Sequence, residues 1–444
     1  MKKITCRAKK KQPKIKTMMT GKGLTVHGGL LPVLNFMERL YFYKAVETAV
    51  HIKRGANARY QFADAVQMIV IGVITGATAM TQVVAVWADE VLRRMAGYKE
   101  VPVDTSLGRI IKEAGHGDVV AIEGLVHRFR TKVWKRAVRG GTYLKSALSV
   151  MWLDVDSTVE GVFGSQEGAE KGYNPKKKGQ NSYHPLMAFV SETKEVLHSW
   201  FRTGNAYTGN GIIEFLKECE VRIKKGIKVI IRADSGFFDG ALLDYLESIG
   251  WGYLIKVKLK NLISLIERQT WKAIKGHPGW EQAEFEHKCA GWSKPRRFVA
   301  VRQLIGIEKG LIELREYQYF CYVTTEDLLP YAAHKKYGER ATCETWIEEC
   351  KTQMNAGHIR TSEFWANSVL FQCAILAYNL LKWMALLTGG VMRQWEIKTI
   401  RLFLIRVAGK LTKNGGQLEL HLPTKFLHQD KWIIWERMAN EIVV

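Results

Sequence analysis

The spacing of apolar residues changes near Ser149, and the order of elements after that point constrains the fold most strongly. Before it the spacing is helical, whereas SVMWLDVDST alternates as a strand does. HPLMAFV and KEVLHSWFR follow and are expected to pair as a hairpin across Ser191–Thr193. The helix GIIEFLKECEVRIKK, the buried strand KVIIRAD, the helix ALLDYLES and the strand WGYLIKVK come next. Three strands and then alternating helices and strands predict an α/β domain.

This element order is that of the ribonuclease H-like fold, in which we look for functional groups at the carboxyl ends of strands. Asp234 ends the strand KVIIRAD, and Ser235 with Gly236 lets the chain turn away. Asp156 lies on the first strand, where Asp154 shares its face. Carboxylates in apolar strands are costly unless they are paired or bind a cation. These acids are therefore candidate ligands.

A second polar group is predicted on the stretch from Tyr337 to Lys351, interpreted as a helix within residues 336–352. Cys343, Trp346 and Cys350 form its apolar face. The opposite face would suit a phosphodiester beside a metal ion, and it carries Tyr337, Arg340, Glu344, Glu348 and Lys351. The alternative is a surface helix with ordinary charge pairs one turn apart.

Asp156, Asp234 and Glu344 together predict a metal site. Each acid alone is explained as a strand-end, turn-capping or helix-surface residue, but all three in this element order favour a shared role. The ligand atoms would all be oxygen, with no Cys or His nearby, which suits Mg²⁺ or Mn²⁺. Two such ions would support an in-line phosphoryl displacement.

The charge balance points to a polyanionic partner. Lys and Arg number 66 against 43 acids, which gives a net charge of +23. Nucleic acid is the first candidate partner and an anionic membrane surface the second. The first sixteen residues hold eight basic side chains and no acid, as in an arm that lies along phosphates.

A membrane span is a further interpretation of Ala65–Trp87, which contains no charged residue. Its polar residues, with Gly72 and Gly76 in the middle, favour two buried helices or one bent helix instead. Seven scattered cysteines without a CxxC pair fit reduced thiols in a cytosolic protein. The N-terminus does not have the pattern of a signal peptide.

The sequence also resembles a known family. Tyr337, Arg340, Glu344 and Lys351 reproduce the Y-(2)-R-(3)-E-(6)-K signature of DDE transposases encoded by bacterial insertion sequences. LDVDST, the following QEGAEKGYNPKKKGQNSYHPL, RADSGFF and ANSVLFQCAILAYNLL are similar to blocks of its "transposase DDE domain, group 1" branch, over roughly residues 149–385.

The resemblance implies a ribonuclease H-like core with a β-rich insertion between the second Asp and the Glu. It implies that Asp156, Asp234 and Glu344 bind the metal ions, with Asp154 as the alternative first ligand or a neighbour of it. Tyr337, Arg340 and Lys351 would hold the DNA strand near the cleaved phosphate.

We therefore expect four regions. These are a basic flexible arm (1–30), a helical DNA-binding domain (31–147), the catalytic domain (148–385, with its β-rich insertion at about 260–330) and a basic C-terminal extension (386–444) that ends in a hairpin.

The expected function is cut-and-paste transposition. The protein would bind the terminal inverted repeats of its element and the target as double-stranded DNA, as a homodimer, with Lys176, Lys177 and Lys178 neutralising phosphates. The expected location is the bacterial cytoplasm, at the nucleoid. The alternatives are a ribonuclease H-like endonuclease without strand transfer, an inactive DNA-binding protein, and a membrane-associated protein.

Overall fold

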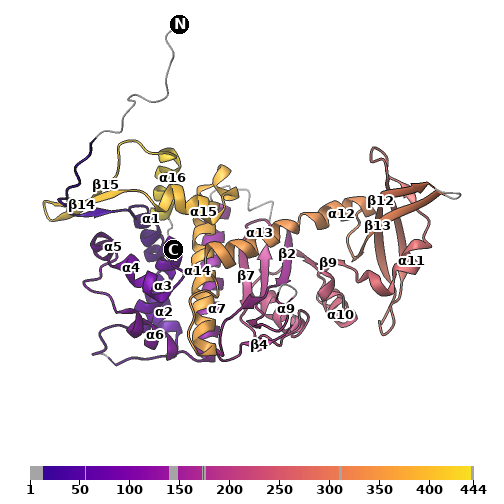
Figure 1. Ribbon diagram of the computed structural model, residues 1–444, viewed down its shortest axis with the longest axis horizontal. Helices are drawn as coiled ribbons and strands as arrows, with labels where there is room; N and C mark the ends of the chain where they lie inside the picture. Colours follow the sequence, from indigo (N-terminus) through magenta and orange to yellow (C-terminus); the bar gives the residue numbers. More distant parts are fainter. Residues whose placement is uncertain are drawn as a thin grey trace, which may run out of the picture.

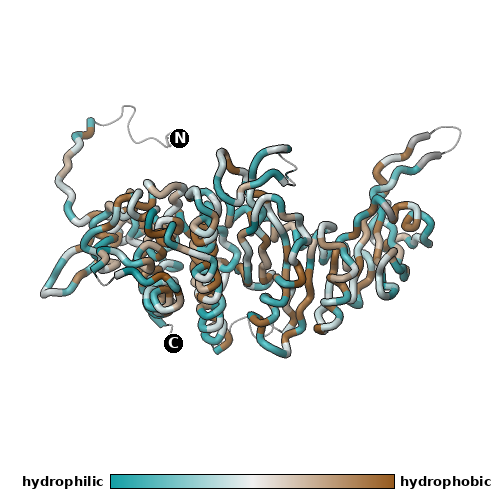
Figure 2. The backbone as a smooth tube through the Cα atoms, turned by 90° about the horizontal axis from the view of Figure 1, so that it is seen from below, coloured by the Kyte–Doolittle hydropathy of each residue, from teal (hydrophilic) through white to brown (hydrophobic). Residues whose placement is uncertain are grey.

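The computed structural model describes residues 14–55, 57–139, 149–172, 174, 177–309 and 313–441. Lys176 and the first thirteen residues of the basic arm lie outside this part of the chain. The molecule is elongated, with helices at one end, a large sheet in the middle and a long β-hairpin at the other end (Figure 1). Hydrophobic stretches run through the helices and the sheet, while many turns at the rim are hydrophilic (Figure 2).

The N-terminal part is helical, as predicted. Its helices are α1 (Leu30–Arg39), α2 (Phe42–Ala49), α3 (Phe62–Thr75), α4 (Met80–Trp87), α5 (Glu90–Met95), α6 (Asp104–Lys112) and α7 (His116–Arg139).

The uncharged stretch Ala65–Trp87 forms a helical corner, which confirms the prediction of two helices or one bent helix. α3 and α4 meet at 91°. Gly76 ends α3 with a φ of 107°, in a region that side chains with a Cβ rarely adopt. Gly72 lies where an added Cβ would meet the Val83 side chain at 2.9 Å, so the glycine lets the two helices pack closely.

A mixed sheet forms the centre. Its strands are β2 (Val150–Ser157), β6 (Leu186–Val190), β7 (Glu195–Trp200), β8 (Lys228–Ala233), β9 (Gly252–Lys256), β10 (Lys272–Ala273), β11 (Trp280–His287), β12 (Arg296–Lys309) and β13 (Glu313–Thr324). They lie in the order β10-β11-β12-β13-β9-β8-β2-β6-β7. β2, β8 and β9 are parallel, while β2, β6 and β7 form an antiparallel meander. The predicted hairpin and the alternating elements after it are confirmed.

Helices cover both faces of this sheet. α9 (Ile212–Glu220) and α10 (Gly240–Ser248) bury Phe215 and Leu243 in a core that also contains Leu153 and Ile231 from the sheet. On the other face Trp152, Ile230, Leu254 and Tyr322 pack with Ala333 of a later helix.

The β-rich stretch predicted as an insertion continues the same sheet. β13 pairs with β9 in antiparallel register, with Val323 opposite Ile255. After β9 the chain forms η2 (Leu259–Asn261) and α11 (Ile263–Glu267), and strands β10 to β13 then extend the sheet outward. The strands are thus present, and they are joined to the core by backbone hydrogen bonds.

The long helix α14 (Phe364–Thr388) lies between the N-terminal helices and the central sheet (Figure 1). It contacts α3, α7 and β7, and almost all of its side chains are buried. By length and composition it could cross a membrane, but its apolar window is 100% buried inside the protein. Its polar residues are satisfied internally: Asn379, for example, exchanges two hydrogen bonds with the backbone of Val196.

The C-terminal region contains the predicted hairpin but does not end in it, because a further helix follows. β14 (Gly409–Asn414) and β15 (Gln417–His421) pair, and β1 (Leu24–Thr25) adds to them as a third strand. α16 (Gln429–Asn440) packs on α1 and α14. The remaining short elements are β3 (Glu160–Gly161), β4 (Glu170–Lys171), β5 (Asn181–Tyr183), η1 (Ser235–Phe237), η4 (Gly390–Gln394), α15 (Ile397–Ile400) and η5 (Arg401–Ile405).

Candidate active site

The stretch expected as one helix over residues 336–352 is broken. α12 (Pro330–Gly338) ends before Arg340, α13 (Ala341–Glu348) begins after it, and η3 (Glu349–Gln353) continues as a π-helix. The two helices pack on different parts of the sheet, and Gly338 is a poor helix former at the junction. The predicted apolar face is confirmed, because Cys343, Trp346 and Cys350 are all buried.

The three predicted acids come together at one end of the sheet. In the parallel pair β2–β8, Val155 lies opposite Ala233, so Asp156 and Asp234 follow side by side at the carboxyl ends. Glu344 approaches from α13. Burial raises the pKa of Asp156 to about 6; Arg340 opposes this rise, and the negative charges of Asp234 and Glu344 add to it. The three carboxylates therefore share one electrostatic environment.

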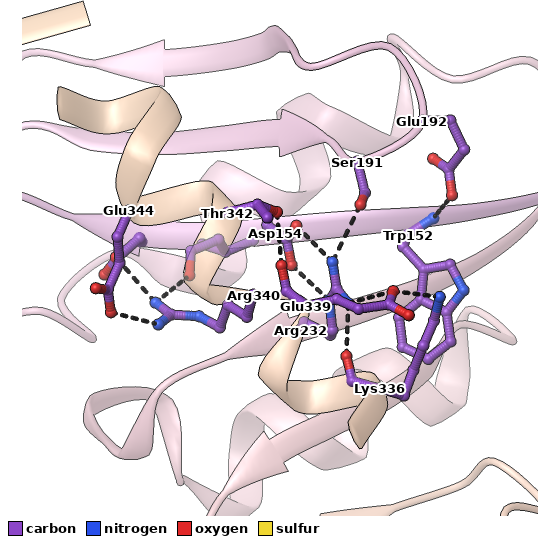
Figure 3. A network of polar contacts seen from close by, with 12 residues as sticks. Trp152, Asp154, Ser191, Glu192, Arg232, Lys336, Glu339, Arg340, Thr342 and Glu344 are labelled. Carbon is purple, nitrogen blue, oxygen red and sulfur yellow. Dashed lines mark hydrogen bonds and ion pairs between the residues drawn. The ribbon is translucent and has the colours of Figure 1, made fainter. Parts of the chain in front are cut away.

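Arg340 lies between two of these acids. Its Nη2 is 2.9 Å from Oδ2 of Asp156, and its Nη1 is 3.9 Å from Oε1 of Glu344 (Figure 3). The Asp156 side chain is 14% exposed, whereas that of Glu344 is 71% exposed. Arg340 itself is buried, and its Nε has no hydrogen-bond partner among the described residues. A guanidinium in this position neutralises one of the three negative charges.

Tyr337 lies at the end of α12 and faces the same group. Its ring packs on Tyr322 of β13 with the centroids 4.7 Å apart. Burial raises the pKa of Tyr337 to about 12; Arg340 opposes the rise, and all three acids add to it. The phenol thus remains protonated at neutral pH and can donate a hydrogen bond.

Lys351 and Lys177 border a cleft next to Asp234. Lys351 Nζ donates to Thr158 Oγ1 and to the Val159 carbonyl, each at 2.9 Å. Both lysines line a pocket of about 420 Å³ together with Asp234. Lys178 is exposed in the same loop but does not line the pocket, and Lys176 lies outside the described residues.

His184 also lies in this cleft and was not among the predicted site residues. It is 2% exposed, lines the pocket, and its Nδ1 contacts the Ala206 carbonyl. Burial lowers the pKa of His184, so the imidazole is neutral at pH 7. A lone His before a proline carries no pattern by itself, and only its place beside Asp234 makes it notable.

Asp154 has a different role from Asp156. It is completely buried, and its two oxygens accept hydrogen bonds from Nε and Nη2 of Arg232 at 2.7 and 2.8 Å. Arg232 also donates to the Lys336 carbonyl and to Ser191 Oγ, so it links the sheet to α12 (Figure 3). Because Asp154 already has a full partner, Asp156 is the better candidate for the first ligand.

A signal for this pair is present in the sequence, although the pair was not predicted. Arg232 is a charged residue within the apolar strand KVIIRAD, and Asp154 holds a corresponding place on β2. Two opposite charges inside neighbouring buried strands predict each other, because either one alone would be costly to bury.

A separate group of candidate ligands lies under β7. One ligand atom each of Glu123, His198 and Glu218 lies within 4.8 Å of the others. None of the three belongs to the predicted triad. His198 Nε2 is 2.8 Å from Glu218 Oε2, and Gln372 Nε2 donates to Glu123 at 3.0 Å. These contacts make it a polar network between β7 and the helices packed on it, buried at Glu123 and His198 and partly exposed at Glu218.

The structure thus defines an α/β protein with clustered acids and basic side chains at the carboxyl ends of its parallel strands. The family model of transposase DDE domain group 1 matches residues 7–440, nearly the whole sequence. The chain belongs to this family of transposases, enzymes that cut and rejoin DNA.

Among curated proteins, no match is found. Among solved structures, the chain is similar to the piggyBac transposase in a cryo-EM synaptic complex with hairpin DNA. The TM-score is 0.44 at 13% identity, over 86% of this chain and 80% of that one.

Proposed function

We propose that this transposase binds the terminal inverted repeats of its insertion sequence and moves it by a cut-and-paste route, using Asp156, Asp234 and Glu344 in a ribonuclease H-like core. The observation that carries the proposal is the meeting of these three acids at the ends of β2 and β8, with Tyr337 and Arg340 of the signature in the same electrostatic environment.

The three acids fit divalent metal ions. All their donor atoms are oxygens, as Mg²⁺ and Mn²⁺ prefer. With the acids ionised, Arg340 leaves the group of four side chains with two negative charges, which a divalent ion would balance. Asp234 uses Oδ1 to accept the Gly236 N–H at 2.8 Å, which anchors the carboxylate at the end of β8. Two bound ions, with Mg²⁺ as the first candidate and Mn²⁺ as the alternative, would act as Lewis acids on the phosphodiester.

The basic side chains then have distinct tasks. Arg340 is positioned by Asp156 and can bind a phosphate oxygen beside the acids. Lys351 is held by Thr158 and Val159 at the cleft, and Lys177 lies across it. Tyr337 donates a hydrogen bond from its hydroxyl to the same strand of DNA. These groups would bind and orient double-stranded DNA at the transposon end and at the target.

The helical N-terminal part would recognise the repeats, and a homodimer would hold two ends at once. The basic Lys178 and the arm that precedes the helices would add phosphate contacts, which weaken as salt rises.

A cleavage assay tests the proposal. Purified protein is incubated with a plasmid that carries the gene and its natural flanks, with Mg²⁺ or with EDTA. We expect metal-dependent breaks at the flanks that disappear in Glu344→Gln. Glu214→Gln is the matched control, because Glu214 is an exposed acid on α9 and is not one of the candidate site residues.

Strand transfer is measured in the same reaction by adding a second plasmid as target. Joined products support transposition. Breaks without joined products would identify an endonuclease instead. Binding without breaks, with Glu344→Gln equal to wild type, would show that the acids are structural.

A further inference from the structure

A basic groove lies between α7 and the segment that leads into β8, away from the acids. It has a volume of about 710 Å³. Five of its lining residues are Lys or Arg, and none is Asp or Glu. These five are Arg130, Lys135 and Arg139 from α7, and Arg222 and Lys224 from the following segment. We call it the α7 groove.

The charges of this groove are less compensated than others in the protein. Arg232 and Arg296, for example, are paired closely with acids. Lys135, Arg139 and Lys224 are exposed and make no ion pair or hydrogen bond within the described part of the chain. Arg222 forms a long ion pair with Glu218 at 3.9 Å, and its Nη1 also donates a hydrogen bond to the Glu218 carbonyl.

Arg130 lines the groove with one donor that has no hydrogen-bond partner among the described residues, although the buried Glu195 carboxylate interacts with its charge. It is 1% exposed, and its Nη1 donates to the Leu197 carbonyl at 2.7 Å. Its Nη2 is buried without a hydrogen-bond partner among the described residues. A buried charged donor left unpaired is costly, and a phosphate oxygen in the groove would relieve that cost.

The floor of the groove is apolar. Val221 is 76% exposed and Val138 is 36% exposed, and both line it. Exposed apolar side chains between cations suit the sugar–phosphate backbone of DNA, which presents apolar sugar carbons between its charges.

The groove is remote from the acids. Ile227 lines it and precedes β8, whereas Asp234 follows β8. Asp234 lies seven residues after Ile227 along extended chain, a distance of about 23 Å, which equals about seven base pairs of duplex.

We infer that the α7 groove is a second DNA-binding site, which holds backbone phosphates at least about seven base pairs from the scissile phosphate. The inference rests on the proposed function, since it takes the acids as the point of cleavage. DNA held there would be positioned by contacts that the catalytic cleft does not make.

The test is binding of two labelled duplexes in EDTA, measured by fluorescence anisotropy over a range of salt. One duplex extends about five base pairs on either side of the element's terminal phosphate, and the other extends about 25. The variant is Lys135→Ala with Arg139→Ala. The control, Lys272→Ala with Lys275→Ala, removes the same charge from the outer edge of the sheet.

We expect the α7 variant to lower the salt slope for the long duplex by about 1.8 and to weaken its binding about tenfold or more, with the short duplex unaffected. Lys135→Arg with Arg139→Lys should restore binding. Equal losses for both lengths, or equal losses in the control, overturn the inference. Stronger competition by polyglutamate than by unlabelled duplex would assign the groove to an acidic protein and overturn it as well.

Nicking of the long duplex by the wild type with Mg²⁺ is measured in parallel. If the wild type nicks the long duplex but the α7 variant weakens binding equally for both lengths, the inference about the groove is refuted and the proposed function is not. A length-dependent effect without nicking supports the groove and refutes the proposed function.

Discussion

Replacing Asp154 by asparagine separates a structural acid from a metal ligand. The Asp154 and Arg232 side chains are both completely buried, and their two short hydrogen bonds form a fork. Asparagine removes the negative charge and one acceptor, which leaves the buried guanidinium with the half-exposed Glu339, 3.3 Å from its Nη1, as the remaining acidic partner among the described residues. Loss of one partner of a buried pair costs about 3–5 kcal/mol.

This cost can be measured as a change in melting temperature. With about 2.1 cal/mol/K of unfolding entropy per residue, a cooperative chain of 444 residues shifts by about 1 °C per kcal/mol. Differential scanning calorimetry should therefore show Asp154→Asn melting about 4 °C below wild type. Glu284→Gln is the control, because its pair with Arg297 is half exposed and is worth about 1 kcal/mol or less.

The nicking activity of Asp154→Asn and Asp156→Asn distinguishes the structural acid from the metal ligand. Metal-dependent nicking, scored below the melting transition, should persist in Asp154→Asn and be lost in Asp156→Asn. The reasoning is refuted if Asp154→Asn melts like wild type but does not nick DNA.

Three other changes test separate features. Burial raises the pKa of Glu160 to about 7, with Arg360 and Lys351 opposing the rise. Between about pH 4.5 and 7 the folded protein therefore holds a proton that the unfolded chain releases, so the free energy of unfolding falls as the pH rises through this range. Urea titrations should show Glu160→Gln to be more stable than wild type by up to about 3 kcal/mol at about pH 8 and equally stable at about pH 4.5. A stability difference that does not change with pH would contradict this. Lys351→Ala should lower the salt slope of DNA binding by about 0.9, whereas the exposed control Lys398→Ala should leave the slope unchanged. If the slopes of Lys351→Ala and wild type are equal, Lys351 does not contact the DNA. Gly76→Ala should destabilise by about 1–2 kcal/mol because of its positive φ, whereas Gly108→Ala inside α6 should not destabilise, as thermal melts would show.

Local structure was predicted well from the sequence, because local structure depends on the spacing of residues along the chain. The meander, the alternating elements after it and the C-terminal hairpin all lie where the apolar pattern indicates. The acids at the ends of β2 and β8 were also found in advance, since a carboxylate at the end of a buried strand stands out.

Contacts between distant segments were harder to predict. Nothing local in FCYVT shows that Val323 pairs with Ile255, so the outer strands were predicted as a β-rich insertion without being assigned a place in the sheet. The break at Arg340 was missed for the same reason, because helical spacing continues through it while its two halves pack on different neighbours. That Arg232 joins β2 to α12 was recognised only from its hydrogen-bond partners on these two elements.

The position of α14 has a consequence for synthesis of the chain. This helix fills the core of the N-terminal helices, yet it is made after more than 360 residues have left the ribosome. β1 likewise waits for β14, which lies more than 380 residues later. The early helices contact one another, but they cannot bury the apolar surface that faces α14 until α14 has been made, so a ribosome-bound chain exposes that surface for most of its synthesis. A fragment that ends before α14 should aggregate, so the helical part is not a module that can be detached.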